Sequence, residues 1–255
     1  MNFQAARKYL SLPIMNSIFY LLLPGSAFAA NCNFQFTLYG GYNHSETSVS
    51  DLVISPLETD SLHNSNGGND FLGGAGVAYQ QMLTDDEDNG TIFRDVSLGL
   101  NFFMFNNSSS DEVYQFKDPQ FDNFNYQLKL ETSRLMLDGQ LDFQPLWQDV
   151  IPFVEASVGV ARVVAKYNES PEPDEGIQDG DIDLTDRTNY QFAYSLGAGF
   201  KTNLSPQVQL SLSYLFTDFG TVKTSTHAPQ LTLDSPISIQ LRTHTALLGL
   251  SYLFA

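Results

Sequence analysis

Residues 190–216, YQFAYSLGAGFKTNLSPQVQLSLSYLF, decide the fold of this chain. Large apolar side chains occupy every second position on both sides of a break at Ser205-Pro206. A strict period of two predicts β-strands with two unlike faces. A Ser-Pro break between two such runs predicts that they form a hairpin.

The second face of this hairpin consists of small side chains. Ser195, Gly197, Gly199, Ser211 and Ser213 stand where a water-soluble sheet would carry Lys, Glu or Thr. Small residues suit the crowded interior of a narrow closed barrel, which leaves the aromatic face pointing outward. The pattern therefore indicates a transmembrane barrel whose outer surface meets lipid.

Six further stretches show the same alternation, and aromatic residues gather near both ends of the strands, as expected at two membrane interfaces. The predicted outward positions are Phe34, Phe36 and Leu38; Phe71, Ala75, Val77 and Tyr79; Val96, Leu98, Leu100, Phe102 and Met104; Leu135, Leu137, Leu141 and Phe143; Val154, Val158 and Val160; and Ala246, Leu248, Leu250, Tyr252 and Phe254.

The fourth stretch changes phase. Tyr126, Leu128 and Leu130 share one parity, whereas Leu135 and Leu137 share the other. If all of them faced outward, one extra residue would have to be absorbed, so the sequence predicts a β-bulge within residues 131–134.

Connections between the stretches alternate in length. The short ones are residues 83–91, 144–150 and 202–207, and the long polar ones are residues 45–69, 106–123, 169–189 and 218–236. Short turns on one side and long loops on the other are typical of outer-membrane barrels. We therefore predict an all-β fold: an eight-stranded antiparallel up-and-down transmembrane β-barrel, residues 30–255, with surface-exposed loops.

The N-terminus resembles a secretory signal peptide. Arg7 and Lys8 precede an apolar run that ends at Ala27-Phe28-Ala29, which predicts cleavage after residue 29. A retained anchor helix is the alternative. Cleavage would lower Lys and Arg from 12 to 10 against 29 Asp and Glu, so the net charge would move from −17 to −19. A surface this acidic excludes nucleic acid as a partner.

Cys32 is the single cysteine, so the chain has no internal disulfide framework. Asn31 precedes it where a lipoprotein signal needs a small residue, which disfavours lipid modification. A free thiol is the simplest interpretation, with a linkage between chains as the alternative.

The chain resembles the small outer-membrane β-barrel proteins of Gram-negative bacteria, the group of opacity-type, OmpX-like and OmpA-barrel-like proteins. The resemblance rests on residues 152–160, 196–200 and 214–220 and on the ending LGLSYLF at 248–254. By that resemblance, Leu250, Tyr252 and Phe254 form a C-terminal signal for the barrel-assembly machinery, although Ala255 follows the terminal aromatic. It also implies lipid and lipopolysaccharide as partners, with no cofactor.

An acidic stretch in the third long loop is a weak calcium candidate. Asp179, Asp181 and Asp183 are spaced like calcium ligands, but the glycine and glutamate of an EF-hand loop are missing. The alternative is a solvated acidic loop that gathers divalent cations loosely.

Six charged residues are predicted to point into the barrel: Asp95, Arg134, Asp138, Asp142, Glu155 and Lys201. Charges inside a narrow barrel must be paired, so we expect a structural polar network. An ion path is the alternative, because the inward glycines leave room for a narrow pore.

The four histidines are the candidates for enzymatic residues. His44-Ser45 and Thr226-His227 are the nearest candidates for lipid hydrolysis, but neighbours on a strand point to opposite faces. We therefore predict a non-enzymatic surface protein, in adhesion or envelope structure. The third and fourth strands are expected to protrude as a hairpin whose edge and aromatics bind a host or surface ligand, or pack against other loops. A narrow pore is the second prediction, and a lipid-modifying enzyme a distant third.

Overall fold

The computed structural model describes residues 32–83, 91–147, 149–172, 181–229 and 231–254. The chain divides into two units, Met1–Cys32 and Asn33–Ala255; the predicted signal peptide, residues 1–29, lies outside the described residues. Within the described residues, no helix has the length and apolar character needed to cross a membrane.

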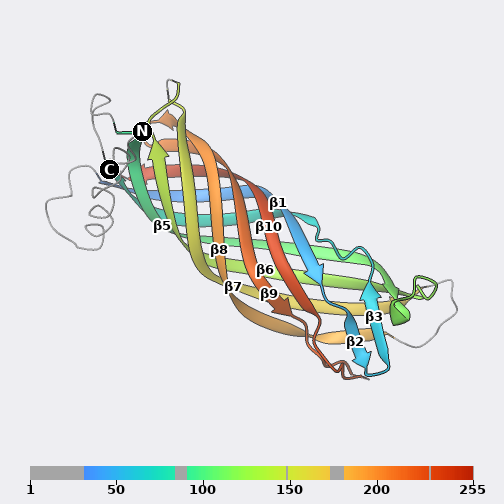
Figure 1. Ribbon diagram of the computed structural model, residues 1–255. Helices are drawn as coiled ribbons and strands as arrows, with labels where there is room; N and C mark the ends of the chain where they lie inside the picture. The colour runs from blue at the N-terminus through green and yellow to red at the C-terminus, as the bar shows by residue number, and fades with distance from the viewer. Residues whose placement is uncertain (1–31, 84–90, 148, 173–180, 230, 255) are drawn as a thin grey trace, which may run out of the picture. The chain divides into compact units, whose positions relative to one another are not determined.

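Among the described residues of the second unit, the structure has ten strands and one short 3-10 helix (Figure 1). Their bounds are β1 Cys32–Val49, β2 Leu52–Ser55, β3 Glu58–Leu62, β4 Asn69–Met82, β5 Phe93–Tyr114, η2 Gln115–Lys117, β6 Phe124–Phe143, β7 Ile151–Pro171, β8 Ile182–Ser205, β9 Val208–Lys223 and β10 Ser238–Phe254.

Eight of these strands form a closed antiparallel ring in the order β5-β4-β1-β10-β9-β8-β7-β6, which closes through pairing of β5 with β6. Strand β1 pairs with β10 from Phe34↔Phe254 to Val49↔Ile239, so the first and last strands are neighbours. Closure gives every strand two partners and removes the free sheet edges. The predicted eight-stranded up-and-down barrel is confirmed.

The long connections are shorter than predicted, because the strands continue into them. β5 extends to Tyr114 and pairs with β6 up to Val113↔Phe124, and β8 begins at Ile182. The connection after β1 contains its own hairpin, β2 and β3, which attaches to β5 through Ser61↔Tyr114 and Leu62↔Val113. The ring therefore carries two strands beyond the eight predicted, at the end marked by β2 and β3 in Figure 1.

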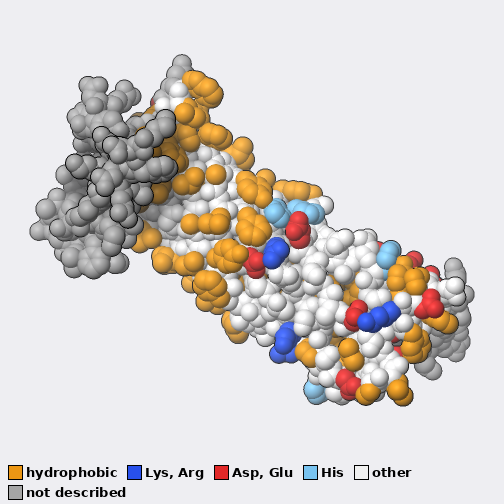
Figure 2. Space-filling model, viewed as in Figure 1, with side chains coloured by type: hydrophobic (Ala, Val, Ile, Leu, Met, Phe, Trp, Pro, Cys, Tyr) orange, Lys and Arg blue, Asp and Glu red, His pale blue; other side chains and the backbone are white. Residues whose placement is uncertain are grey.

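The alternation of the hairpin 190–216 has the predicted orientation. Leu212 and Tyr214 are more than half exposed, whereas Ser213 is buried, and Leu196 and Phe200 also point outward. Figure 2 shows hydrophobic side chains crowded over one half of the visible face. Charged side chains and histidines lie over the other half, with a smaller apolar group at its far end.

The β-bulge predicted within residues 131–134 of β6 is not present, so this prediction is wrong. Its pairing with β5 and β7 runs without a register shift through residues 131–134. Leu128 and Leu130 are buried inside the ring, while Leu135 and Leu137 are exposed on its outside. The apolar residues change face along one regular strand, because the medium outside the barrel changes from lipid to water.

A bulge lies instead on β9. Between the pairs Thr221↔Gln240 and Asp218↔Arg242, two residues of β9 oppose the single residue Leu241 of β10. Gly220 adopts a positive φ of 69°, a conformation that glycine tolerates and side chains disfavour. The extra residue brings both Phe219 and Val222 to the interior, where they are fully buried.

Candidate functional site: a filled lumen and a packed surface extension

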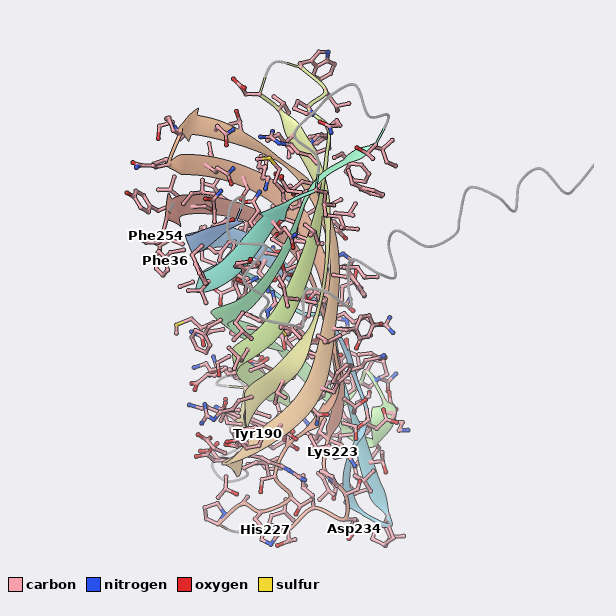
Figure 3. All side chains as sticks on the ribbon, turned by 90° about the vertical axis from the view of Figure 1, so that its left-hand side faces the viewer. Phe36, Tyr190, Lys223, His227, Asp234 and Phe254 are labelled. Carbon is pink, nitrogen blue, oxygen red and sulfur yellow. The ribbon has the colours of Figure 1, made fainter. Side chains whose placement is uncertain are left out.

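The barrel has two parts with different interiors. The lumen is the interior of the half whose outside is apolar, from the level of Phe34 and Phe254 to that of Tyr42 and Phe71. The surface extension is the other half, made of β2, β3, residues 43–49, 105–114, 124–132, 163–171, 182–189, 217–223 and 238–243, and the described connections between these segments. Phe36 and Phe254 lie towards one end of the barrel and His227 and Asp234 at the other (Figure 3).

Arg134 on β6 fills the upper end of the lumen. Its Cζ lies 4.7 Å from the ring centroid of Phe103 and 5.5 Å from that of Phe219. Nη1 donates a hydrogen bond of 2.5 Å to Thr217 Oγ1, and Thr217 is also hydrogen-bonded to Ser195 at 2.9 Å. β5, which carries Phe103, and β9, which carries Phe219, lie opposite each other in the ring. The stacked guanidinium and rings therefore span the width of the lumen.

A second polar group lies towards the short-turn end of the lumen. Lys201 on β8 forms a buried ion pair with Asp142 on β6, and Gln140 Nε2 donates to Asp142 Oδ1 at 2.7 Å. Asp95 on β5 accepts a hydrogen bond of 2.9 Å from Gln80 Nε2. The ion pair joins β6 to β8, the Gln80–Asp95 bond joins β4 to β5, and together these contacts satisfy much of the buried charge.

A small cavity lies among the lumen side chains. It is lined by Gln35, Thr37, Tyr39, Glu155 and Lys201, among others, and has a volume of about 20 Å³. That volume holds about one water molecule. The glycines that were expected to leave gaps are covered by neighbours: a Cβ on Gly197 would lie 2.8 Å from Glu155 Oε1. The lumen is packed rather than channel-like.

The six predicted inward charges lie at more than one level of the lumen, and Glu155, the electrostatic neighbour of Arg134, lines the same small cavity as Lys201. Asp95, Asp142 and Lys201 lie together at the lower level. Arg134 lies higher, with Glu155 as its electrostatic neighbour, and Asp138 is partly buried near Glu155. Arg94, which was not predicted, lies 3.6 Å from Asp95, from Nε to Oδ2.

The other predicted residues are dispersed. Asp179 lies outside the described residues, while Asp181 and Asp183 are exposed. Leu250, Tyr252 and Phe254 all point outward at the end of β10.

The two histidine pairs do not share an arrangement. His44 faces outward, with Nδ1 2.7 Å from Asn69 Oδ1, whereas Ser45 is buried on the opposite face of β1. His227 lies in an exposed connection, where its Nδ1 is 3.0 Å from Thr226 Oγ1. The prediction that His44 and Ser45 point to opposite faces of the strand is confirmed, because His44 is exposed and Ser45 is buried.

The surface extension has an apolar core. Its interior is filled by Leu52, Val113, Leu128, Val163, Phe219 and Ile239, among others, all essentially inaccessible to solvent. Tyr126 and Tyr167 stack with their rings 11° apart and 6.3 Å between centroids. Sequence periodicity alone does not predict this core, because a period of two does not tell whether the apolar face of a strand points into the barrel or out of it.

Polar groups are also buried within this core. The Tyr167 hydroxyl donates to Glu169 Oε1, and burial raises the pKa of Glu169 to about 7. Asp60 on β3 is buried too, which raises the pKa of its carboxyl, and its Oδ1 accepts a 2.8 Å hydrogen bond from the Phe116 N–H. Asp60 thus anchors the turn η2 to the hairpin β2–β3.

The tip of the extension displays aromatic side chains in a constrained turn. Phe116 and Lys117 have positive φ values of 53° and 60°, which L side chains seldom adopt. Phe116 is 59 % exposed and contacts Phe121 edge-on, with 6.5 Å between ring centroids. Lys117 Nζ lies 2.6 Å from Asp51 Oδ2, which ties the turn to the segment before β2.

The predicted free edge of the protruding hairpin is occupied. β3 pairs with β5 at its tip, and β7 pairs with β6 up to Phe124↔Pro171. Among the aromatic residues of this hairpin, Tyr126 is buried, whereas Phe116 and Phe121 are exposed. A partner strand therefore has no free strand of this hairpin to pair with. The exposed aromatic side chains remain as candidates for binding a partner.

An open groove of about 450 Å³ lies on the outside of the seam between β1 and β10. It is lined by His44, Glu46, Gln240 and Arg242, just above the apolar belt that ends at Tyr42. Arg242 Nε is 3.0 Å from Asp218 Oδ2, and His244 Nε2 is 3.4 Å from Glu46 Oε1. The histidines at the boundary in Figure 2 mark this level.

Comparison with known proteins gives the class. A family model described as the outer membrane protein beta-barrel domain matches residues 17–254. The chain belongs to this family and is an outer-membrane β-barrel protein. A comparison with curated proteins found no match.

Several solved structures are similar to this chain at low identity. Neisserial surface protein A is 15 % identical, covering 86 % of this chain and 97 % of its own, with a TM-score of 0.43. OprG of Pseudomonas aeruginosa is 15 % identical, covering 86 % and 95 %, with a TM-score of 0.44. Ail of Yersinia pestis, solved with the heparin analogue sucrose octasulfate, is 14 % identical, covering 87 % and 99 %, with a TM-score of 0.36.

Proposed function

We propose that this protein is a non-enzymatic surface-interaction protein, whose barrel holds a rigid extension above the outer membrane. The observation that carries the proposal is the exposed pair Phe116 and Phe121, of which Phe116 has a positive φ and is anchored by Asp60. Strained backbone persists only where the surrounding structure imposes it, and such positions cluster at binding sites. Aromatic side chains fixed on a rigid support are the residues that dominate protein interfaces.

The filled lumen supports this role over conduction. Arg134, Phe103 and Phe219 lie together at the upper end, and a cavity lined by side chains below them has a volume of about 20 Å³. An eight-stranded barrel encloses a space that its own side chains just fill. The loops at the extension's end are therefore the part of the molecule through which we expect function to act.

The charge of the chain limits the class of partner. With a net charge of −17, the protein disfavours polyanionic ligands, since like charges repel. The expected partner presents an apolar or aromatic surface to Phe116 and Phe121. In the same proposal, the apolar outer wall of the barrel contacts the hydrocarbon chains of lipid and lipopolysaccharide, and the barrel-assembly machinery recognises Leu250, Tyr252 and Phe254.

An attachment assay tests the proposal. Cells that display the protein are compared with cells that display Phe116→Ser/Phe121→Ser for attachment to polystyrene and to a cultured epithelial layer. Loss of two aromatic anchors is expected to weaken attachment by about tenfold. Surface level and heat-modifiable gel migration are matched first, and His227→Ala, another exposed change in the extension, serves as the control. Equal attachment by wild type and double variant on both surfaces would overturn the proposal.

A further inference from the structure

Three metal-ligating side chains converge on the outside of the surface extension. His63 Nδ1 lies 3.4 Å from Asp111 Oδ1 and 4.0 Å from Glu112 Oε2. One ligand atom from each of the three residues falls within 4.8 Å of the other two. His63 follows the end of β3, and the two carboxylates come from the upper part of β5.

These separations suit a shared metal ion. Ligand atoms about 2.1 Å from a common divalent ion are about 3–4 Å apart, in tetrahedral or octahedral geometry. The side chains are partly exposed, at 48 %, 25 % and 41 %, so an ion can enter from solvent and retain water as its remaining ligands. A small rotation of the Glu112 side chain would complete the set.

The backbone holds His63 in place at both ends. Its N–H donates to Glu112 O at 3.0 Å, and its carbonyl accepts the Tyr126 hydroxyl at 2.9 Å. Its ring also lies against that of Tyr114, with 5.0 Å between centroids. The imidazole is therefore positioned by contacts that do not depend on the carboxylates.

Asp111 is oriented by groups that are not ligands. Its Oδ1 accepts a 2.9 Å hydrogen bond from the Glu112 N–H, and the Asn64 side chain hydrogen-bonds to the same carboxylate. Asn64 has a positive φ of 44°, which places its side chain beside Asp111. Partners of this kind orient the ligands in metal sites and raise their affinity.

The convergence of Asp111 and Glu112 is itself unusual. Adjacent residues on a strand point to opposite faces. Here both carboxylates lie near the same imidazole, because His63 follows the last pair of β3 with β5, Leu62↔Val113, where strand β3 ends. Two negative charges at one point repel each other, and a cation between them would remove that repulsion.

We propose that His63, Asp111 and Glu112 form a binding site for a divalent transition-metal ion of the zinc class. The imidazole selects such ions over calcium and magnesium, which prefer oxygen ligands alone. Because His63 follows β3 and the carboxylates lie on β5, the ion joins the hairpin β2–β3 to the barrel. Binding is expected to stabilise the tip that carries Phe116, since metal affinity adds to the stability of the bound state.

Calorimetry on the full-length protein in detergent micelles tests the site. Zinc chloride is titrated in the presence of excess calcium and magnesium, which occupy loose acidic sites. One zinc ion is expected to bind the wild type, and His63→Ala and Asp111→Asn are expected to weaken binding at least about tenfold. The cobalt form should show visible absorption bands that disappear in His63→Ala.

His227→Ala is the matched control, because it removes another exposed histidine of the extension and should leave zinc affinity unchanged. Amide exchange provides a second measurement: zinc should slow exchange around residues 61–64 and 111–113 in wild type alone. Zinc binding that His63→Ala leaves intact, or that calcium abolishes, would show only a diffuse acidic surface and overturn the proposal. Absence of binding by wild type would do the same.

Discussion

Glu169 is the residue at which burial and ionisation conflict most clearly in the surface extension. It is 5 % exposed, among the stacked tyrosines, and burial raises its pKa from an ordinary 4.5 to about 7. The folded extension therefore prefers the protonated acid. A neutral carboxyl can keep the hydrogen bond with Tyr167 without the desolvation of a charge.

The extension is expected to gain stability as the pH falls from 8 to about 4.5. Because the pKa of Glu169 is raised on folding, its favourable contribution is complete below about 4.5 and is lost as the pH rises through about 7. The difference is on the order of 2–3 kcal/mol. Amide exchange at the upper ends of β7 and β8 measures it.

Glu169→Gln should remove this pH dependence and slow exchange at pH 8, since glutamine stays neutral. Asp181→Asn, an exposed change in the same region, should retain the dependence of the wild type. A Glu169→Gln protein whose exchange still varies with pH as wild type does would assign the effect to another buried acid, Asp60 being the first to test.

At the scale of an element, β6 is one regular strand whose side chains alternate between the inside and the outside of the barrel, and its two halves lie in different environments. Leu128 points into the core of the extension, and Leu137 points outward to lipid. The two leucines lie nine residues apart on one strand, but the first packs in a protein core and the second contacts lipid. Charged substitutions at the two positions should therefore impair different properties of the protein.

Leu137→Arg is expected to oppose membrane insertion by about 2–4 kcal/mol, because it places a cation against lipid. Leu128→Arg should leave insertion intact and unfold the extension, since its cation would enter an apolar core. Heat-modifiable migration measures the first effect, and proteolysis of the surface segments on intact cells measures the second. The interpretation of β6 fails if Leu128→Arg blocks insertion while its extension stays resistant to protease.

The bulge predicted for β6 shows what periodicity leaves undetermined. A period of two separates the faces of a strand, but which face is apolar depends on whether lipid or water lies outside. Around residues 190–216 the small size of the second face settled that choice correctly. On β6 the change in apolar parity predicted a bulge in the backbone, whereas the structure has a regular strand and a different medium outside the barrel.

The candidate sites were less predictable than the fold. Inward charges such as Lys201 and Asp142 were identified because a polar residue on the small face must enter the barrel. The anchor between Asp60 and Phe116 joins residues 56 apart, and no local pattern marks it. The convergence of His63 with Asp111 likewise depends on the pairing of β3 with β5, which the sequence did not indicate.

At the scale of the whole molecule, the packed lumen determines whether the barrel conducts. Wild type is expected to show no stable conductance steps in planar bilayers, because Arg134 and the rings beside it close the upper lumen. Arg134→Ala should produce small steps by removing a large, fully buried side chain. Arg134→Met should stay closed, since it keeps most of the volume without the charge.

Arg162→Ala is the control for this experiment, because Arg162 lies on the neighbouring strand β7 and faces outward. Reproducible steps from wild type would contradict the closed lumen and favour the pore alternative. Equal conductance of the Arg134→Ala and Arg134→Met proteins would show that charge, rather than bulk, closes the barrel.

The continuity of the strands has a mechanical consequence. β5, β6, β7 and β8 run without interruption from the membrane to the tip, joined by hydrogen bonds that lie across their direction. Tension applied at Phe116 along the barrel would load many of these bonds together in shear instead of unzipping them singly. An attached cell would thus be tethered by the whole wall of the barrel, and detachment should occur at the contact before the anchor tears.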